Sequence, residues 1–209
     1  MTRSSTLRTS LAAGACLAAA ACGGEPSAAW TPPPTPTVSP TQTPEAAGST
    51  TVPDTIPQLP GTGFRARVGV VPSEVLARST WGPSCDISPD DLRWVVLTFR
   101  GFDGRRHTGE LLVNQSVVPD VVEVFHELWD DGYPLQEMAI LGKTDLVSPP
   151  SDSHDTSGFV CRPDRSGYTP EDQGLTLDVS PPGAPVREAF AHVDWTWAGP
   201  EDPTRYTAP

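Results

Sequence analysis

The sequence predicts an α+β fold, a small antiparallel sheet with packed helices, for the domain that spans residues 63–209. Two observations carry this prediction. Residues 92–99 and 109–114 are rich in β-branched and aromatic side chains, and the turn sequence Phe-Asp-Gly-Arg at 102–105 lies between them, so we expect a β-hairpin. Residues 119–131 have the apolar spacing of an amphipathic helix. A domain of this length can bury a core of its own.

The helix predicted over residues 119–131 has signals at both ends. Pro119 suits its first turn, and Asp120 and Glu123 complement the positive end of the helix dipole. Gly132 follows the last helical residue and marks the end. The spacing i, i+3, i+4 and i+7 predicts a buried face that consists of Val121, Val124, Phe125 and Leu128.

Three further elements are predicted after this helix. Residues 135–141 and 175–179 are expected to form strands, and residues 186–193 a short helix. The sequence shows no internal repeat, so these elements are expected to form one domain.

The N-terminus has the character of an export signal. Arg3 and Arg8 precede an apolar run at 11–21, which is too short to span a bilayer and is typical of a signal peptide over residues 1–21. The sequence Ala-Ala-Ala-Cys that ends at Cys22 is similar to a bacterial lipobox, in which the cysteine is lipidated after cleavage. An ordinary signal peptide, cut just before this cysteine, is the alternative. In both cases the mature protein is expected outside the cytoplasm.

Residues 22–62 are predicted to be a disordered stalk that follows the lipidated cysteine. The segment is dominated by Pro and Thr, has few charges and no basic residue, and cannot bury enough apolar surface to fold. Its prolines favour an extended polyproline II conformation, so the stalk would hold the domain away from the membrane and toward the cell wall. A proline-rich ligand segment for another protein is the alternative interpretation.

The charge of the chain excludes some partners. The sequence has 14 basic and 26 acidic residues, for a formal net charge of −12 at pH 7. Such an acidic chain is not expected to bind nucleic acid or anionic lipid surfaces. The lipid on Cys22 is therefore the only membrane attachment that we expect.

The cysteines predict one disulfide. Cys16 leaves with the signal peptide and Cys22 carries the lipid, so Cys85 and Cys161 remain in the mature chain. Two thiols in an exported domain most simply pair with each other. A metal-binding role would need another Cys or His near them at ligand spacing, which the sequence lacks.

Several motifs occur in the order typical of one enzyme family. Residues 99–111 contain Phe-Arg-Gly-Phe-Asp-Gly and His-Thr-Gly-Glu-Leu, residues 156–162 read Thr-Ser-Gly-Phe-Val-Cys-Arg, and Trp-Thr-Trp-Ala-Gly occupies 195–199. These motifs resemble the zinc D-alanyl-D-alanine carboxypeptidases of the VanY-like branch. The resemblance covers residues 80–209 and implies the Hedgehog/D-Ala-D-Ala-peptidase-like form of an α+β fold.

The resemblance also places the family's catalytic positions on this chain. In the family, Ser-x-His-x-x-Gly-x-x-x-Asp supplies two zinc ligands, and Asp/Glu-x-x-His supplies the base and the third ligand. Here Gly174 and Asp178 keep the spacing, but Glu171 replaces the His. Arg205 occupies the base position and Ala208 the third ligand position. Because arginine cannot act as a base near neutral pH and alanine has no lone pair, we expect a degenerate member without a cofactor.

Arg162 and Asp178 are the two family positions that this chain keeps. Arg162 matches the arginine that in the family steadies the charge of the substrate and the transition state. One interpretation is that Arg162 and Asp178 form a structural ion pair. The other is that they remain part of a substrate-binding site for a peptide carboxylate, which a guanidinium can hold with two parallel hydrogen bonds.

A zinc site built from substitute ligands is the alternative to a degenerate one. Glu171 and Asp178 would supply two oxygen ligands, and His154, Glu201 or Asp202 would supply the third. With zinc bound, the chain would be an active D-alanyl-D-alanine carboxypeptidase or endopeptidase that acts on peptidoglycan stem peptides.

Three functions are therefore open at the level of sequence. The first is a non-catalytic lipoprotein that faces the cell wall and binds peptidoglycan stem peptides or a cell-envelope protein. The second is the active zinc peptidase with substitute ligands. The third is a scaffold that has no ligand in the former active-site groove.

Overall fold

The fold is defined for residues 56–147, 155–162 and 169–209, which the computed structural model describes. They belong to one compact unit, Pro44–Pro209. The predicted signal peptide, the lipidation site at Cys22 and nearly all of the predicted stalk lie outside the described residues. No helix in the described part of the chain is long and apolar enough to cross a membrane.

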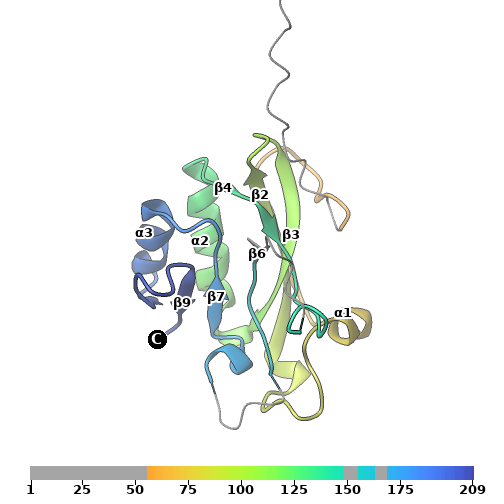
Figure 1. The fold of residues 1–209 in the computed structure, drawn as a ribbon. Coiled ribbons are helices and arrows are strands. Elements are labelled where there is room, and N and C mark those ends of the chain that lie inside the picture. The colour runs from red at the N-terminus through yellow and green to blue at the C-terminus, as the bar shows by residue number, and fades with distance from the viewer. Residues whose placement is uncertain (1–55, 148–154, 163–168) are drawn as a thin grey trace, which may run out of the picture. The chain divides into compact units, whose positions relative to one another are not determined.

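A largely antiparallel sheet forms the centre of the domain (Figure 1). It has the order β1 (Ala66–Gly69), β2 (Leu92–Gly101) and β3 (Arg106–Asn114), and the short strand β4 (Pro134–Leu135) pairs in parallel with the end of β2. The predicted hairpin is confirmed, because β2 and β3 pair antiparallel along their whole length. Gly104 in the connecting turn has a φ of 72°, a conformation that suits a residue without a Cβ atom.

Two helices and the sheet enclose the main core. They are α2 (Val118–Asp130), which begins one residue before the predicted start, and α3 (Ala184–His192), which corresponds to the predicted C-terminal helix. All four residues of the predicted face of α2 are buried, so that prediction is confirmed. Burial of each large apolar side chain contributes about 1.5–3 kcal/mol. The main core includes Val95, Leu97, Phe99, Leu111, Val113, Val121, Val124, Phe125, Leu128, Phe190 and Tyr206.

A smaller core lies on the opposite face of β2 and β3. The short helix α1 (Ser73–Arg78), which the sequence did not predict, contributes to it. Buried Glu110 ties this helix to the sheet, because its Oε2 accepts from Arg78 Nη2 at 2.6 Å and from Trp94 Nε1 at 2.8 Å. Burial on both faces explains why the middle of β2, residues 94–97, is an unbroken apolar run rather than an alternating pattern. The residues of the smaller core are Val75, Ile87, Leu92, Leu112, Phe159 and Cys161.

The C-terminal part of the chain forms a separate antiparallel sheet. Its order is β7 (Thr176–Asp178), β9 (Arg205–Thr207) and β8 (Thr196–Trp197). The strand predicted at β7 is confirmed, whereas β8 and β9 were not predicted, because two or three residues are too few for a periodic pattern. Tyr206 of β9 is fully buried and stacks on Phe190 of α3, with 4.1 Å between the ring centroids.

The segment 155–162 runs between the two sheets (Figure 1). It starts with β6 (Asp155–Thr156). Ser157 then exchanges two backbone hydrogen bonds of 2.9 Å with Asp178 of β7. On the other side, Phe159 N donates to a backbone carbonyl of β3 at 2.7 Å. These bonds hold the segment between β7 and β3.

The strand predicted over residues 135–141 is only partly right. In its place the chain forms β4 and then β5 (Glu137–Met138), each two residues long. The reason is a change of partner, because β4 pairs with β2 whereas β5 pairs in parallel with β6.

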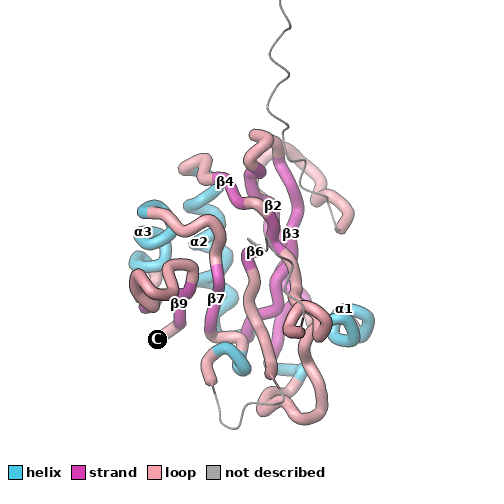
Figure 2. Tube along the Cα trace, in the orientation of Figure 1, coloured by secondary structure: helices cyan, strands magenta, loops and turns pink. Residues whose placement is uncertain are grey.

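Within the described ranges, three short 3₁₀ helices, coloured like the other helices in Figure 2, join these elements. They are η1 (Pro89–Asp91), η2 (Gln115–Val117) and η3 (Glu171–Gln173). The combination of small, mainly antiparallel sheets with separate helices confirms the predicted α+β class. The Hedgehog/D-Ala-D-Ala-peptidase-like form of this class stays a prediction.

Candidate functional site

Arg205 lies among three carboxylates at the C-terminal sheet. Its Nε and Nη2 atoms donate to the two oxygens of Asp178, each at 3.2 Å, which is a bidentate pair. Asp202 Oδ2 is 3.4 Å from Nε, and Glu171 Oε1 is 4.0 Å from Nη2. The side chain of Glu171 is buried, and 34% of the Arg205 side chain is exposed. We call these four residues, together with Arg162, the arginine–carboxylate cluster.

Arg162 joins the cluster through Glu171. Its Nη1 is 2.6 Å from Glu171 Oε1. One of the two interpretations, a structural ion pair between Arg162 and Asp178, is wrong, because each of the two side chains has a different partner. Two backbone contacts explain the difference: Val160 N donates to Glu171 O, which brings that acid next to Arg162, and Arg205 stands directly opposite Asp178 in the pairing of β7 with β9.

Gly174 allows η3 and β7 to lie against β3. Its φ is 68°, in the left-handed region, and a Cβ atom at this position would lie 2.7 Å from Asn114 N. Asn114 N donates to the carbonyl of Gly174 at 2.9 Å.

Burial and the charges of the cluster shift the pKa values of Asp178 and Arg205. Burial raises the pKa of Asp178 above its ordinary value, the charges of Glu171 and Asp202 act in the same direction, and the contact with Arg205 only partly offsets them. Burial lowers the pKa of Arg205, but its contact with Asp178 and the nearby acids outweighs this effect, so the pKa of Arg205 is raised. Arg205 is therefore a permanent cation. Three carboxylates and two guanidiniums leave one formal negative charge on the cluster.

The donors in the cluster do not fit a zinc ion. Zinc ions in proteins are bound mainly by His and Cys side chains, with a fourth position that a protein ligand or a water molecule fills. This cluster offers only carboxylates. The oxygens of Asp178 and Glu171 already accept from guanidinium groups, and Arg205 would repel a divalent cation next to them. Within the described ranges, no group of three or more His, Cys, Asp and Glu side chains is arranged to hold a metal ion.

We expect the purified protein to bind zinc no more tightly than an adventitious site does. The physical reason is the cationic Arg205 between Asp178 and Asp202. Metal analysis after dialysis is the measurement. Stoichiometric zinc that survives dialysis, and that is lost in Glu171→Ala, would instead support the substitute-ligand site.

The remaining predicted site residues do not meet in one place. Ala208, at the position of the third ligand, packs against the main core, and its amide donates to Leu175 O at 2.9 Å. Asp202 is in the cluster, whereas Glu201 is exposed. His154 lies outside the described residues.

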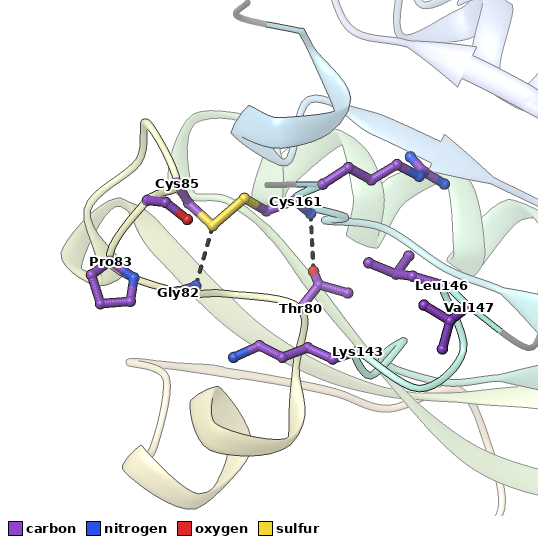
Figure 3. A pocket seen from close by; sticks show the side chains of 10 residues that line it. Thr80, Gly82, Pro83, Cys85, Lys143, Leu146, Val147 and Cys161 are labelled. Carbon is purple, nitrogen blue, oxygen red and sulfur yellow. Dashed lines mark hydrogen bonds between the residues drawn. A yellow bond between two sulfur atoms is a disulfide. The ribbon is translucent and has the colours of Figure 1, made fainter. Parts of the chain in front are cut away.

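A cavity of about 380 Å³ adjoins the cluster, with Arg162 as the shared residue (Figure 3). This volume lies within the range of small-molecule sites, roughly 300–1,000 Å³. The predicted disulfide between Cys85 and Cys161 is confirmed and forms one wall. The other lining residues are Thr80, Gly82, Pro83, Ser84, Lys143, Leu146 and Val147.

The sequence analysis missed three residues of this region. Lys143 carried a signal that was not used, because it is the only lysine in the sequence. Asp172 carried another: Thr169 and Asp172 have capping-box spacing, and Thr169 Oγ1 donates to Asp172 Oδ2 at 2.6 Å. Thr80, whose hydroxyl accepts from Cys161 N at 3.0 Å, had no signal, since the two residues are 81 positions apart.

Comparisons with protein-family models, characterised proteins and solved structures found no match for this chain. The fold and the site define it as an α+β domain in which an arginine–carboxylate cluster borders a cavity. The resemblance to carboxypeptidases stays a prediction.

Proposed function

We propose that this chain is an exported lipoprotein, anchored to the cell membrane through Cys22, whose carboxypeptidase-like domain faces the cell wall. There it binds peptidoglycan stem peptides and does not cleave them. The observation that carries this proposal is the position of Arg205, whose guanidinium stands among Asp178, Asp202 and Glu171.

The cluster supports binding rather than hydrolysis. Metal-assisted hydrolysis needs a cation with a free coordination position for water and a carboxylate that takes the proton of that water. A guanidinium supplies positive charge but has no coordination position, and it accepts no proton near neutral pH. Asp178 and Glu171 are already engaged in charge-assisted hydrogen bonds, so neither is a free base.

Arg162 is the residue best suited to hold the end of a peptide. Nη1 of Arg162 donates to Glu171. The other two nitrogens of this guanidinium, Nε and Nη2, have no partner among the described residues and can donate to a ligand. The Arg162 side chain is 30% exposed and lines the cavity. A guanidinium with two free donors can hold a carboxylate bidentately, which a terminal D-alanine would present.

A peptide that ends in D-alanine is expected to bind weakly, and amidation of its terminus is expected to lower the affinity about ten- to a hundredfold. This is the loss of a charge-assisted bidentate contact, about 1.5–3 kcal/mol. Arg162→Lys should cost nearly as much, because a point charge does not reproduce the guanidinium fork. Isothermal titration calorimetry of both peptides against both proteins is the measurement.

Arg105→Lys is the matched control, since Arg105 lies in the exposed turn of the hairpin. It should leave both affinities unchanged. Equal affinities for acid and amide in wild type and in Arg162→Lys would contradict peptide binding at this arginine. Release of D-alanine on addition of zinc would support the peptidase alternative, and capture of a cell-envelope protein without any affinity for the peptides would favour a protein partner.

A further inference from the structure

Lys143 is an exposed cation in a strongly acidic chain. It is the only lysine among 209 residues, and the net charge is −12. Arg78, Arg162 and Arg205 each form an ion pair with a buried or partly buried acid. Lys143 is exposed and has no hydrogen-bond or ion-pair partner among the residues that the structure describes.

The turn that carries Lys143 directs it toward a neighbouring loop. Gly142 N donates to Asp145 Oδ2 at 2.7 Å, so the acid of this turn is already engaged by the backbone. The ammonium of Lys143 extends toward the loop of Gly82 and Pro83 (Figure 3), and a Cβ atom added at Gly82 would lie 4.0 Å from Nζ.

Two hollows meet at this ammonium group. The cavity of about 380 Å³ and a second one of about 290 Å³ share Gly82, Pro83 and Lys143. The second hollow is lined mainly by apolar groups, including those of Leu76 and Trp81. A ligand that crosses Gly82 from one hollow to the other therefore passes the ammonium of Lys143.

The larger cavity has cations from two separate segments and an apolar surface. Lys143 and Arg162 both line it, and so do the aliphatic side chains of Leu146 and Val147. Thr80, a buried residue, adds a hydroxyl that accepts from Cys161 N. A hydroxyl that accepts one hydrogen bond keeps a hydrogen with which it can donate another. The cavity lining has two cationic side chains and two hydroxyl groups, those of Thr80 and Ser84, but no carboxylate, which favours an anionic ligand.

We infer that Lys143 and Arg162 together bind a ligand with two carboxylates, namely a peptide that has an acidic side chain close to its free C-terminus. Lys143 holds the side-chain carboxylate, Arg162 holds the terminal carboxylate, and the aliphatic carbons between them lie against Leu146 and Val147. The assignment of Arg162 rests on the proposed function. The assignment of Lys143 rests on its place in the lining of both hollows and on the absence of a partner for it among the described residues.

Four probes separate the two contacts. They are acetyl-Glu-D-Ala, acetyl-Gln-D-Ala and the C-terminal amide of each. Against wild type, replacement of Glu by Gln in the probe should lower the affinity roughly tenfold. This is the effect expected for the loss of one charge-assisted hydrogen bond whose strength is reduced by solvent screening. Against Lys143→Gln the same replacement should change the affinity less than about twofold, because the partner of the carboxylate is gone.

Arg105→Gln is the matched control, since it removes the same charge from the exposed hairpin turn. It should keep the full difference between the Glu and Gln probes. A second readout is NMR after reductive ¹³C-methylation of the single lysine, a modification that keeps its positive charge. The resonance of Lys143 is identified by its absence from Lys143→Gln. It should shift when the Glu probes are added and not when the Gln probes are added.

Two results overturn the inference. One is equal affinity of wild type for the Glu and Gln probes, and the other is a difference that persists in Lys143→Gln. A failure of the proposed function alone would give a different result. The free-acid and amide forms of each probe would bind wild type equally, while Lys143→Gln would still lower the affinity for the Glu probes. If no probe binds wild type, both are overturned.

Discussion

Replacement of both Cys85 and Cys161 by alanine is expected to lower the free energy of unfolding by about 4 kcal/mol. The two cysteines are 76 positions apart, so the disulfide closes a long loop and removes much of the conformational freedom of the unfolded chain. For a domain of this size the melting temperature should fall by roughly 10 °C. Urea unfolding followed by tryptophan fluorescence measures the difference.

The single replacement Cys85→Ala is the natural control for this prediction. It opens the same loop and should lose nearly the same stability as the double replacement. Reduction should destabilise wild type and leave both variants unchanged. Wild-type stability that reduction does not alter would show that the disulfide contributes nothing, and a mass-spectrometric map without a peptide linking Cys85 to Cys161 would show that it does not form.

Replacement of Arg205 by alanine is expected to destabilise the folded protein by about 2 kcal/mol at neutral pH. Asp178 loses a bidentate partner, and a partly buried charged group left without its hydrogen bonds costs about 1–3 kcal/mol or more. Glu171 keeps its contact with Arg162, which limits the loss. Urea unfolding at pH 7 is the measurement.

The loss should shrink in acid. Burial already raises the pKa of folded Asp178 above the unfolded value, so its ionised form destabilises the fold, and this cost disappears as the pH falls through the raised pKa. Without Arg205, which lowers that pKa, the cost in the variant is larger and begins to fall at a higher pH. The difference between wild type and Arg205→Ala should therefore be smaller at pH 4 than at pH 7.

Arg105→Ala serves as the matched control, because an exposed arginine in a turn should change stability by less than about 0.5 kcal/mol. A deficit of the same size at pH 4 and pH 7 would show that Asp178 is not its source. An Arg205→Ala variant as stable as wild type would mean that the pair with Asp178 is fully screened by water.

Long elements with a clear pattern were predictable from the sequence. Helix α2 repeats its apolar residues over three turns, and the β2–β3 hairpin has long strands on both sides of a glycine turn, so local signals suffice. The short elements were not predictable. Helix α1 and strand β9 have six and three residues, and packing against distant segments, rather than local preference, gives them their structure.

The ion pairs of the site depended on register between distant segments. The sequence brought Arg162, Glu171, Asp178 and Arg205 to attention, but it suggested the wrong partner for Arg162. Asp178 pairs with Arg205 because β7 and β9 place them opposite each other, although they are 27 positions apart. No local pattern contains that information.

The sequence by itself determined the α+β class, the main hairpin, the two longer helices and the pairing of Cys85 with Cys161. Each of these follows from local periodicity or from the small number of cysteines. Only the tertiary structure decided that Arg205 stands among three carboxylates and that Lys143 lies where two hollows meet. The physical reason is that electrostatic partners depend on distances of 3–4 Å, and such distances between remote segments arise only when the sheets and helices pack.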